Sequence, residues 1–242
     1  MRTKPRRGRP FGLGAVRTGS AAAALVLVMA ASWAVSEPVA VRPPQSPDTP
    51  GRIEGVVDVK LSPTRRRRAL VQASSRRPPT FSGRNKTVVY LQQGPLGAFE
   101  SNESRAILDQ RNEMFSPYVL PVQVGTIVHF PNNDEVFHNV FSLSSTKRFD
   151  LGRYEQGASK SILFDKPGVV RLFCDIHSHM SAFIVVFSHR FFTTTDEAGQ
   201  YSLEGVPEGR YTLVAWADGE IRASTSIDVV PGETARADFV VE

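Results

Sequence analysis

Residues 164–187 read FDKPGVVRLFCDIHSHMSAFIVVF, and this stretch carries the strongest signals for both fold and chemistry. A Lys-Pro-Gly turn at 166–168 joins two strands, and the apolar run 181–187 predicts a further, central strand. Between the strands, residues 174–180 read CDIHSHM and contain the single cysteine of the chain. A chain with one cysteine forms no internal disulfide, so this thiol needs another explanation.

Three roles compete for Cys174: an inert buried side chain, a nucleophile assisted by histidine, or a metal thiolate. His177 lies three positions on and Met180 three beyond that, so a tight loop between strands can turn all three side chains toward one point. If Cys174 were a nucleophile, Met180 would have no role in the chemistry. Imidazole, thiolate and thioether together suit copper, whereas structural zinc prefers several Cys and His ligands.

A trigonal copper site of one Cys and two His, with a weak axial Met, needs another histidine from a different strand. His138 is the best candidate, because it follows the polar turn 131–135 and sits among apolar residues. His179 is the alternative to Met180 as axial ligand, or else a solvent-facing imidazole. Two other histidines are expected outside the site, the first within a strand and the second on the surface: His129 and His189.

The N-terminal segment predicts export. Six basic residues and no acid precede Glu37, and an apolar run follows at 21–35. This pattern is typical of a secretory signal peptide, which we expect to span residues 1–36 and to send the protein to the periplasm or another extracytoplasmic space. The run is short for a membrane span of about 20 residues. An uncleaved anchor is the alternative, and the only route to a membrane that we expect.

Removal of this segment takes the formal net charge from +5 to −1, because its six positive charges leave with it. Nucleic-acid binding therefore loses its main support, and we expect none. The remaining positive charge gathers at residues 60–86, which hold nine basic residues and no acid. This loop is either a solvated, flexible segment or a docking patch for an acidic partner or anionic surface.

Short runs of β-branched and aromatic residues, separated by proline and glycine, predict an all-β protein. After a Pro-rich linker at 37–51, strands are expected at 52–61 and 86–92. Seven or more turn-separated strands up to residue 187 imply a sandwich or barrel. The C-terminal part alternates between polar and apolar residues and predicts four further strands.

Three segments resemble the cupredoxin family, in particular its amicyanin-like and plastocyanin-like members. PNNDEVFHNVFS (131–142) resembles the segment with the first His ligand, FDKPGVVRLFCDIHSHM (164–180) the strand with the Cys-x-x-His-x-x-Met loop, and YVLPVQVGTIVHF (118–130) the preceding strand pair. The resemblance covers roughly residues 103–187 and implies a Greek-key β-sandwich that holds one type 1 copper ion. It implies three equatorial ligands and one axial ligand: His138, Cys174 and His177, with Met180 axial.

The resemblance also implies that Asn139 braces the cysteine loop by hydrogen bonding. Two positions depart from the family pattern, since Asp175 replaces the usual Ser or Thr and Ser178 replaces a common Pro. Neither departure removes a ligand. A carboxylate near copper favours the oxidised ion, so Asp175 is expected to affect the reduction potential, whose value the sequence leaves open.

The segment TTTDEAGQYSLEGVPEGRYTLVAW (193–216) is similar to the carboxypeptidase-regulatory or transthyretin-like sandwich. Alone it has too few strands for a core. We therefore predict that residues 52–93 and 188–242 form one small sandwich, with the copper domain at 103–187 inserted between its second and third strands. Tandem domains, with 52–93 part of the cupredoxin, are the alternative. Chains that combine the two domains are described as methylamine-utilisation-like.

The resemblance implies an exported one-electron carrier between redox partner proteins, and not an enzyme. His177, near the loop surface, would be the exit for the electron. The rival function is copper binding for delivery, storage or sensing by a cell-surface β-sandwich protein, and a third is a structural protein with a vestigial site. The electron donor, the acceptor and the oligomeric state stay open.

Overall fold

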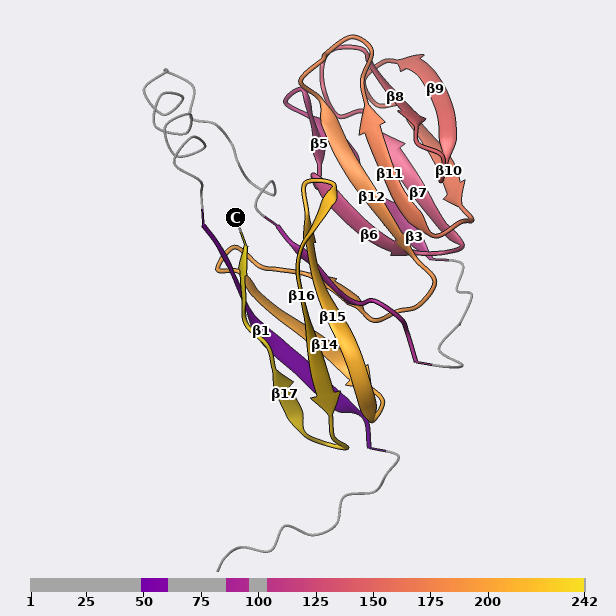
Figure 1. Ribbon diagram of the computed structural model, residues 1–242. Helices are drawn as coiled ribbons and strands as arrows, with labels where there is room; N and C mark the ends of the chain where they lie inside the picture. Colours follow the sequence, from indigo (N-terminus) through magenta and orange to yellow (C-terminus); the bar gives the residue numbers. More distant parts are fainter. Residues whose placement is uncertain (1–48, 61–85, 96–103, 242) are drawn as a thin grey trace, which may run out of the picture. The chain divides into compact units, whose positions relative to one another are not determined.

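The computed structural model describes residues 49–60, 86–95 and 104–241. The regular secondary structure of this part is entirely strand, so the predicted all-β fold is confirmed (Figure 1). A search of these residues finds no helix of the length and apolarity that a membrane span requires. The predicted signal peptide, most of the predicted linker and nearly all of the basic loop lie outside the described residues.

Two sheets enclose the core beneath the candidate site, in the strand orders β6-β12-β11-β8-β9 and β10-β7-β3. The first sheet consists of β6 (Val119–Gln123), β8 (His138–Leu143), β9 (Arg148–Tyr154), β11 (Gly168–Phe173) and β12 (Ser181–Phe187). The second consists of β3 (Arg105–Ile107), β7 (Thr126–Pro131) and β10 (Ser159–Phe164). A separate hairpin is formed by β4 (Asp109–Arg111) and β5 (Met114–Ser116).

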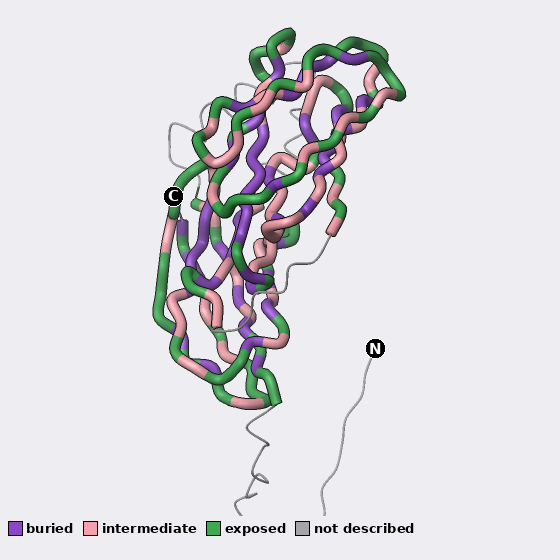
Figure 2. The backbone as a smooth tube through the Cα atoms, turned by 90° about the vertical axis from the view of Figure 1, so that its right-hand side faces the viewer, coloured by how far each residue is buried: buried purple, intermediate pink, exposed green. Residues whose placement is uncertain are grey.

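Buried and exposed residues alternate along many strands, as expected for sheets with one face toward a core (Figure 2). In β7 the buried positions are Thr126, Val128 and Phe130. Strand β12 differs, because it is buried on both faces from Ala182 to Phe187. Its even-numbered residues pack into the core that contains Cys174, and its odd-numbered ones into a cluster with residues outside this sandwich. The predicted central strand at 181–187 is therefore confirmed.

The second sandwich has the strand orders β14-β1-β17 and β13-β2-β15-β16. The first of these sheets consists of β1 (Gly51–Val59), β14 (Gln200–Val206) and β17 (Thr234–Arg236), and β18 (Phe239–Val241) also pairs with β1. The other sheet consists of β2 (Val88–Leu91), β13 (Phe192–Thr194), β15 (Gly209–Ala217) and β16 (Glu220–Val229). Strands before and after the first sandwich in sequence therefore pair with each other.

The observed strands differ from the expected ones in two places. The described C-terminal part has six strands, from β13 to β18, whereas four were expected. The difference arises from the short strands β13, β17 and β18, which pair with β2 or β1. The sequence reading also missed β9. This strand lies at the edge of its sheet and is mostly exposed, so it lacks the apolar alternation that marked the others.

Candidate metal centre

The candidate ligands come from two neighbouring strands of the larger sheet. His138 is the first residue of β8, and the loop 174–180 joins β11 to β12 (Figure 1). Because β11 pairs with both β8 and β12, the loop begins beside the strand that carries His138. One ligand atom from each of His138, Cys174 and His177 lies within 4.8 Å of the others.

Two separations between donor atoms are short enough for a single metal ion. Nδ1 of His138 lies 3.1 Å from Nδ1 of His177, and Sγ of Cys174 lies 3.9 Å from the same atom of His177. Typical metal bonds are about 2.0–2.1 Å to imidazole nitrogen and about 2.3 Å to thiolate sulfur. One ion can therefore span up to about 4.1 Å between two nitrogens and about 4.4 Å between nitrogen and sulfur.

The candidate ligands differ in burial. His138 is 0% exposed, Cys174 5% and Met180 1%, whereas His177 is half-buried. Met180 packs in the same core cluster as Cys174, and its backbone N–H donates to the carbonyl of His177 at 2.9 Å. The predicted axial residue thus lies inside the protein at the end of the ligand loop.

Asp134 holds the far side of the His138 ring, with its Oδ2 at 2.7 Å from Nε2. Burial acts to raise the pKa of Asp134, but hydrogen bonds from the backbone N–H groups of Glu113 and Asn112 and from His138 outweigh it, so the pKa lies below its usual value. A proton on Nε2 that bonds the carboxylate leaves Nδ1 with a free lone pair toward His177. Sequence reasoning did not name Asp134, although it belongs to the polar turn before His138.

Asn139 bridges the cysteine loop to β9. Its Oδ1 accepts the backbone N–H of Asp175 at 3.3 Å, and its Nδ2 donates to Oδ1 of Asp150 at 2.7 Å. The Asp175 side chain is exposed and bonds Arg153. Asp175 thus contacts Asn139 through its own backbone N–H, and its carboxylate bonds the guanidinium of Arg153. The sequence gave no reason to expect the contact with Arg153.

Among the remaining histidines, His179 has its ring centroid 5.9 Å from that of His177 but does not belong to the cluster of converging donors. His179 is exposed, and its Nε2 lies 3.4 Å from a carboxylate oxygen of Glu113. His129, in β7, lies with its Nδ1 2.8 Å from Oγ of Ser161. His189 is 6% exposed, so its expected place on the surface is wrong. Its ring packs beside Phe187 where the chain passes from β12 toward β13.

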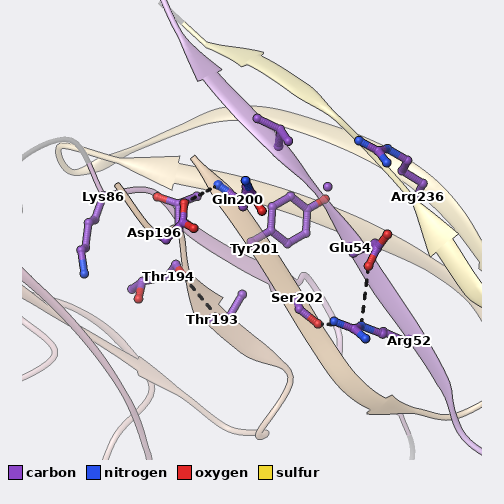
Figure 3. A pocket seen from close by; sticks show the side chains of 13 residues that line it. Arg52, Glu54, Lys86, Thr193, Thr194, Asp196, Gln200, Tyr201, Ser202 and Arg236 are labelled. Atoms are coloured by element: carbon purple, nitrogen blue, oxygen red, sulfur yellow. Dashed lines mark hydrogen bonds and ion pairs between the residues drawn. The ribbon is translucent and has the colours of Figure 1, made fainter. Parts of the chain in front are cut away.

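A polar hollow of about 660 Å³ lies on the other sandwich, among β1, β13, β14 and β17 (Figure 3). Within its wall, Arg52 bonds Ser202 and lies 3.8 Å from Glu54. Asp196 accepts the backbone N–H of Gln200 at 2.8 Å. None of the described residues that line the hollow is His, Cys or Met. It therefore lacks the imidazole and thiol donors that converge at the candidate metal centre.

Comparison with known proteins gives one family match and several structural neighbours. Residues 181–242 match the carboxypeptidase regulatory-like domain, and this match begins at the first residue of β12. A search of curated proteins found no match. Solved structures that match part of the chain include cupredoxins and a Cu-containing nitrite reductase.

Three of these structures illustrate the likeness. A Cu-containing nitrite reductase (NirK) from Thermus scotoductus SA-01 is 26% identical with a TM-score of 0.34, over 40% of this chain and 25% of the reductase chain. A purple cupredoxin from Nitrosopumilus maritimus is 25% identical with a TM-score of 0.31, over 35% of this chain and 100% of that one. A reduced amicyanin variant is 21% identical with a TM-score of 0.32, over 41% and 98%.

Proposed function

We propose that this protein is an exported type 1 copper protein that carries single electrons between redox partners. The observation that carries the proposal is the convergence of two imidazole Nδ1 atoms and the single thiol, with separations of 3.1 and 3.9 Å. This donor set, with a buried thioether at the end of the same loop, is the combination that suits copper.

Copper, when bound, would supply reversible one-electron chemistry. The protein would contribute rigid ligation, because His138 is fixed by Asp134 on its far side and Cys174 lies in a packed core. A site that changes little between oxidation states lowers the reorganisation that accompanies electron transfer. The half-buried His177 would link the site to the surface, where three exposed apolar side chains of the ligand segments would form the docking face: Val136, Phe137 and Ile176.

Carrier function needs no acid–base pair and no substrate cavity, so we propose that the protein is not an enzyme. Export is proposed from the basic and apolar N-terminal segment. We also propose the inserted arrangement of domains, with residues 103–187 inside a second sandwich formed by 52–93 and 188–242. The pairing of β1 with β14 and of β2 with β15 supports this arrangement.

The test is addition of Cu(II) to the purified mature protein, followed by visible absorption and electron paramagnetic resonance spectra. A Cu(II)–thiolate centre absorbs visible light strongly, and Cys174→Ser is expected to abolish that band completely. His177→Ala should weaken or shift the band. His129→Ala is the matched control, because it removes a histidine of the same sandwich that bonds Ser161. A wild-type protein without the band would overturn the proposal.

Copper delivery or storage predicts a different exchange behaviour. An electron carrier should hold its ion through repeated cycles of reduction and reoxidation in the presence of a chelator. A carrier of copper itself should lose the ion to the same chelator. Retention of the visible band over many cycles therefore supports electron transfer, and its loss within the first cycles supports delivery.

A further inference from the structure

The residue after the cysteine is charged and is held at both ends. The backbone N–H of Asp175 bonds Asn139, and its carboxylate Oδ2 receives two hydrogen bonds from Arg153, from Nε at 3.1 Å and from Nη2 at 3.0 Å. These two partners face each other across neighbouring strands, because Asn139 of β8 is directly opposite Arg153 of β9. One cross-strand pair thus fixes the peptide that follows Cys174.

An irregularity in the pairing of β8 with β9 lies next to these contacts. The register between β8 and β9 shifts just after Asn139, and Gly152 has a φ of 63°, in the left-handed region. Asp150 closes this irregularity, since its Oδ1 accepts both Nδ2–H of Asn139 and the backbone N–H of Gly152, at 2.7 and 2.8 Å. β-Bulges near functional sites commonly re-aim side chains. Here the irregular stretch lies between Asp150 and Arg153. Asp150 bonds Asn139, and Arg153 bonds Asp175.

Charge gives Arg153 a second role. A bound thiolate and the adjacent carboxylate would place two negative charges next to each other in sequence, and negative charge stabilises the more positive ion. The guanidinium on the Asp175 carboxylate supplies the compensating positive charge. Its pKa is raised first by the hydrogen bond to Asp175 and then by the charge of that carboxylate, with a smaller effect from Cys174. The side chain therefore stays protonated at every pH in ordinary use.

We propose that Arg153 is a positioning residue of the copper centre, which neutralises Asp175 and thereby keeps the reduction potential higher than the carboxylate alone would allow. This inference rests on the proposed copper function. Both side chains are partly exposed, at 63% and 39%, so solvent screens the interaction and the effect is moderate. Removing the cation is expected to favour Cu(II) over Cu(I) by about threefold to tenfold, because neighbouring charges act at this scale when screened.

The experiment compares the reduction potentials of copper-loaded wild-type protein and variants with intact visible bands. Arg153→Ala should lower the potential by about 28 to 59 mV, at 59 mV per tenfold change for one electron. Asp175→Asn should raise it, and the double variant should return close to the wild-type value. Arg153→Lys, which keeps the charge, should retain most of the potential. Lys147→Ala is the matched control, because it breaks another exposed ion pair, with Asp165 at 2.8 Å.

The possible failures are distinguishable. If wild-type protein forms no copper–thiolate band, the proposed function fails and this inference fails with it. If the band forms and Arg153→Ala changes the potential no more than Lys147→Ala does, the copper function stands and the role of Arg153 is overturned. A potential that falls equally in Arg153→Lys and Arg153→Ala also overturns charge compensation. Thermal unfolding of each variant checks that the fold is retained.

Discussion

Two regions of the molecule each bury a histidine, and they use its ring nitrogens differently. At the candidate metal centre, His138 bonds Asp134 through Nε2, and its Nδ1 faces His177. At the junction between β12 and β13, Nδ1 of His189 accepts the backbone N–H of Phe191 at 3.2 Å, and the ring also bonds the backbone of Leu91. Nδ1 of His138 thus faces another side chain, whereas the ring of His189 makes its hydrogen bonds to backbone groups.

Packing around the second ring reinforces the contrast. A Cβ atom added to Gly94 would lie 2.7 Å from Cβ and Cγ of His189, so the backbone of this glycine sits directly against the side chain. Burial of a histidine therefore says little about function by itself. The groups that face the ring nitrogens distinguish a candidate ligand from a structural side chain.

The largest expected difference between the two regions is in copper binding. His138→Ala should abolish the Cu(II)–thiolate band, because one of two strong nitrogen donors is lost. His189→Ala should leave the band unchanged but destabilise the fold by about 1–3 kcal/mol, since a buried backbone N–H loses its acceptor. Visible absorption of copper-loaded protein and thermal unfolding of both variants provide the measurements. A normal band in His138→Ala would contradict the assignment of His138 as a copper ligand.

A smaller effect is expected from the carboxylate behind His138. Asp134→Asn should weaken copper binding by about 10- to 100-fold, because a group that orients a ligand histidine and raises its basicity is lost. Competition with a chelator of known affinity measures the change. Asp165→Asn is the control, since it removes the same charge from an exposed carboxylate paired with Lys147. Equal affinities in the two variants would contradict a role for Asp134 at the site.

The same contrast explains what could be predicted from the sequence. The fold class follows from alternating strands and turn residues, which are local signals. The candidate ligands could be named because Cys174, His177 and Met180 lie in one short loop, and because His138 follows a conspicuous polar turn. The two segments need only the pairing of β8 with β11 to come together, and the structure brings one ligand atom from each of His138, Cys174 and His177 within 4.8 Å.

The supporting residues could not be found in this way. Arg153 lies 22 positions before Asp175 in an exposed edge strand without apolar alternation, so neither the strand nor the ion pair leaves a local signal. Asp134 was within the quoted turn, but a carboxylate in a polar turn ordinarily faces solvent. His189 was misplaced on the surface because its burial depends on Gly94, a contact between segments far apart in sequence.

The smallest expected effect concerns acid stability at the junction. Burial lowers the pKa of His189 below its ordinary value, with a hydrogen bond to the backbone of Leu91 acting in the opposite direction. The unfolded chain therefore takes up a proton near pH 6.5 while the folded protein stays neutral, so stability is lost as the pH falls below about 6.5. The loss is at most about 1.4 kcal/mol per pH unit for one group.

His189→Asn should remove this dependence, because the amide oxygen can accept the N–H of Phe191 and does not titrate. Thermal unfolding of the metal-free proteins between pH 7.5 and about 5.5 measures the effect without competition between protons and copper. If His189→Asn and wild type lose stability in parallel, the ring at the junction is protonated in the folded state, and the neutral, structural role assigned to it here is wrong.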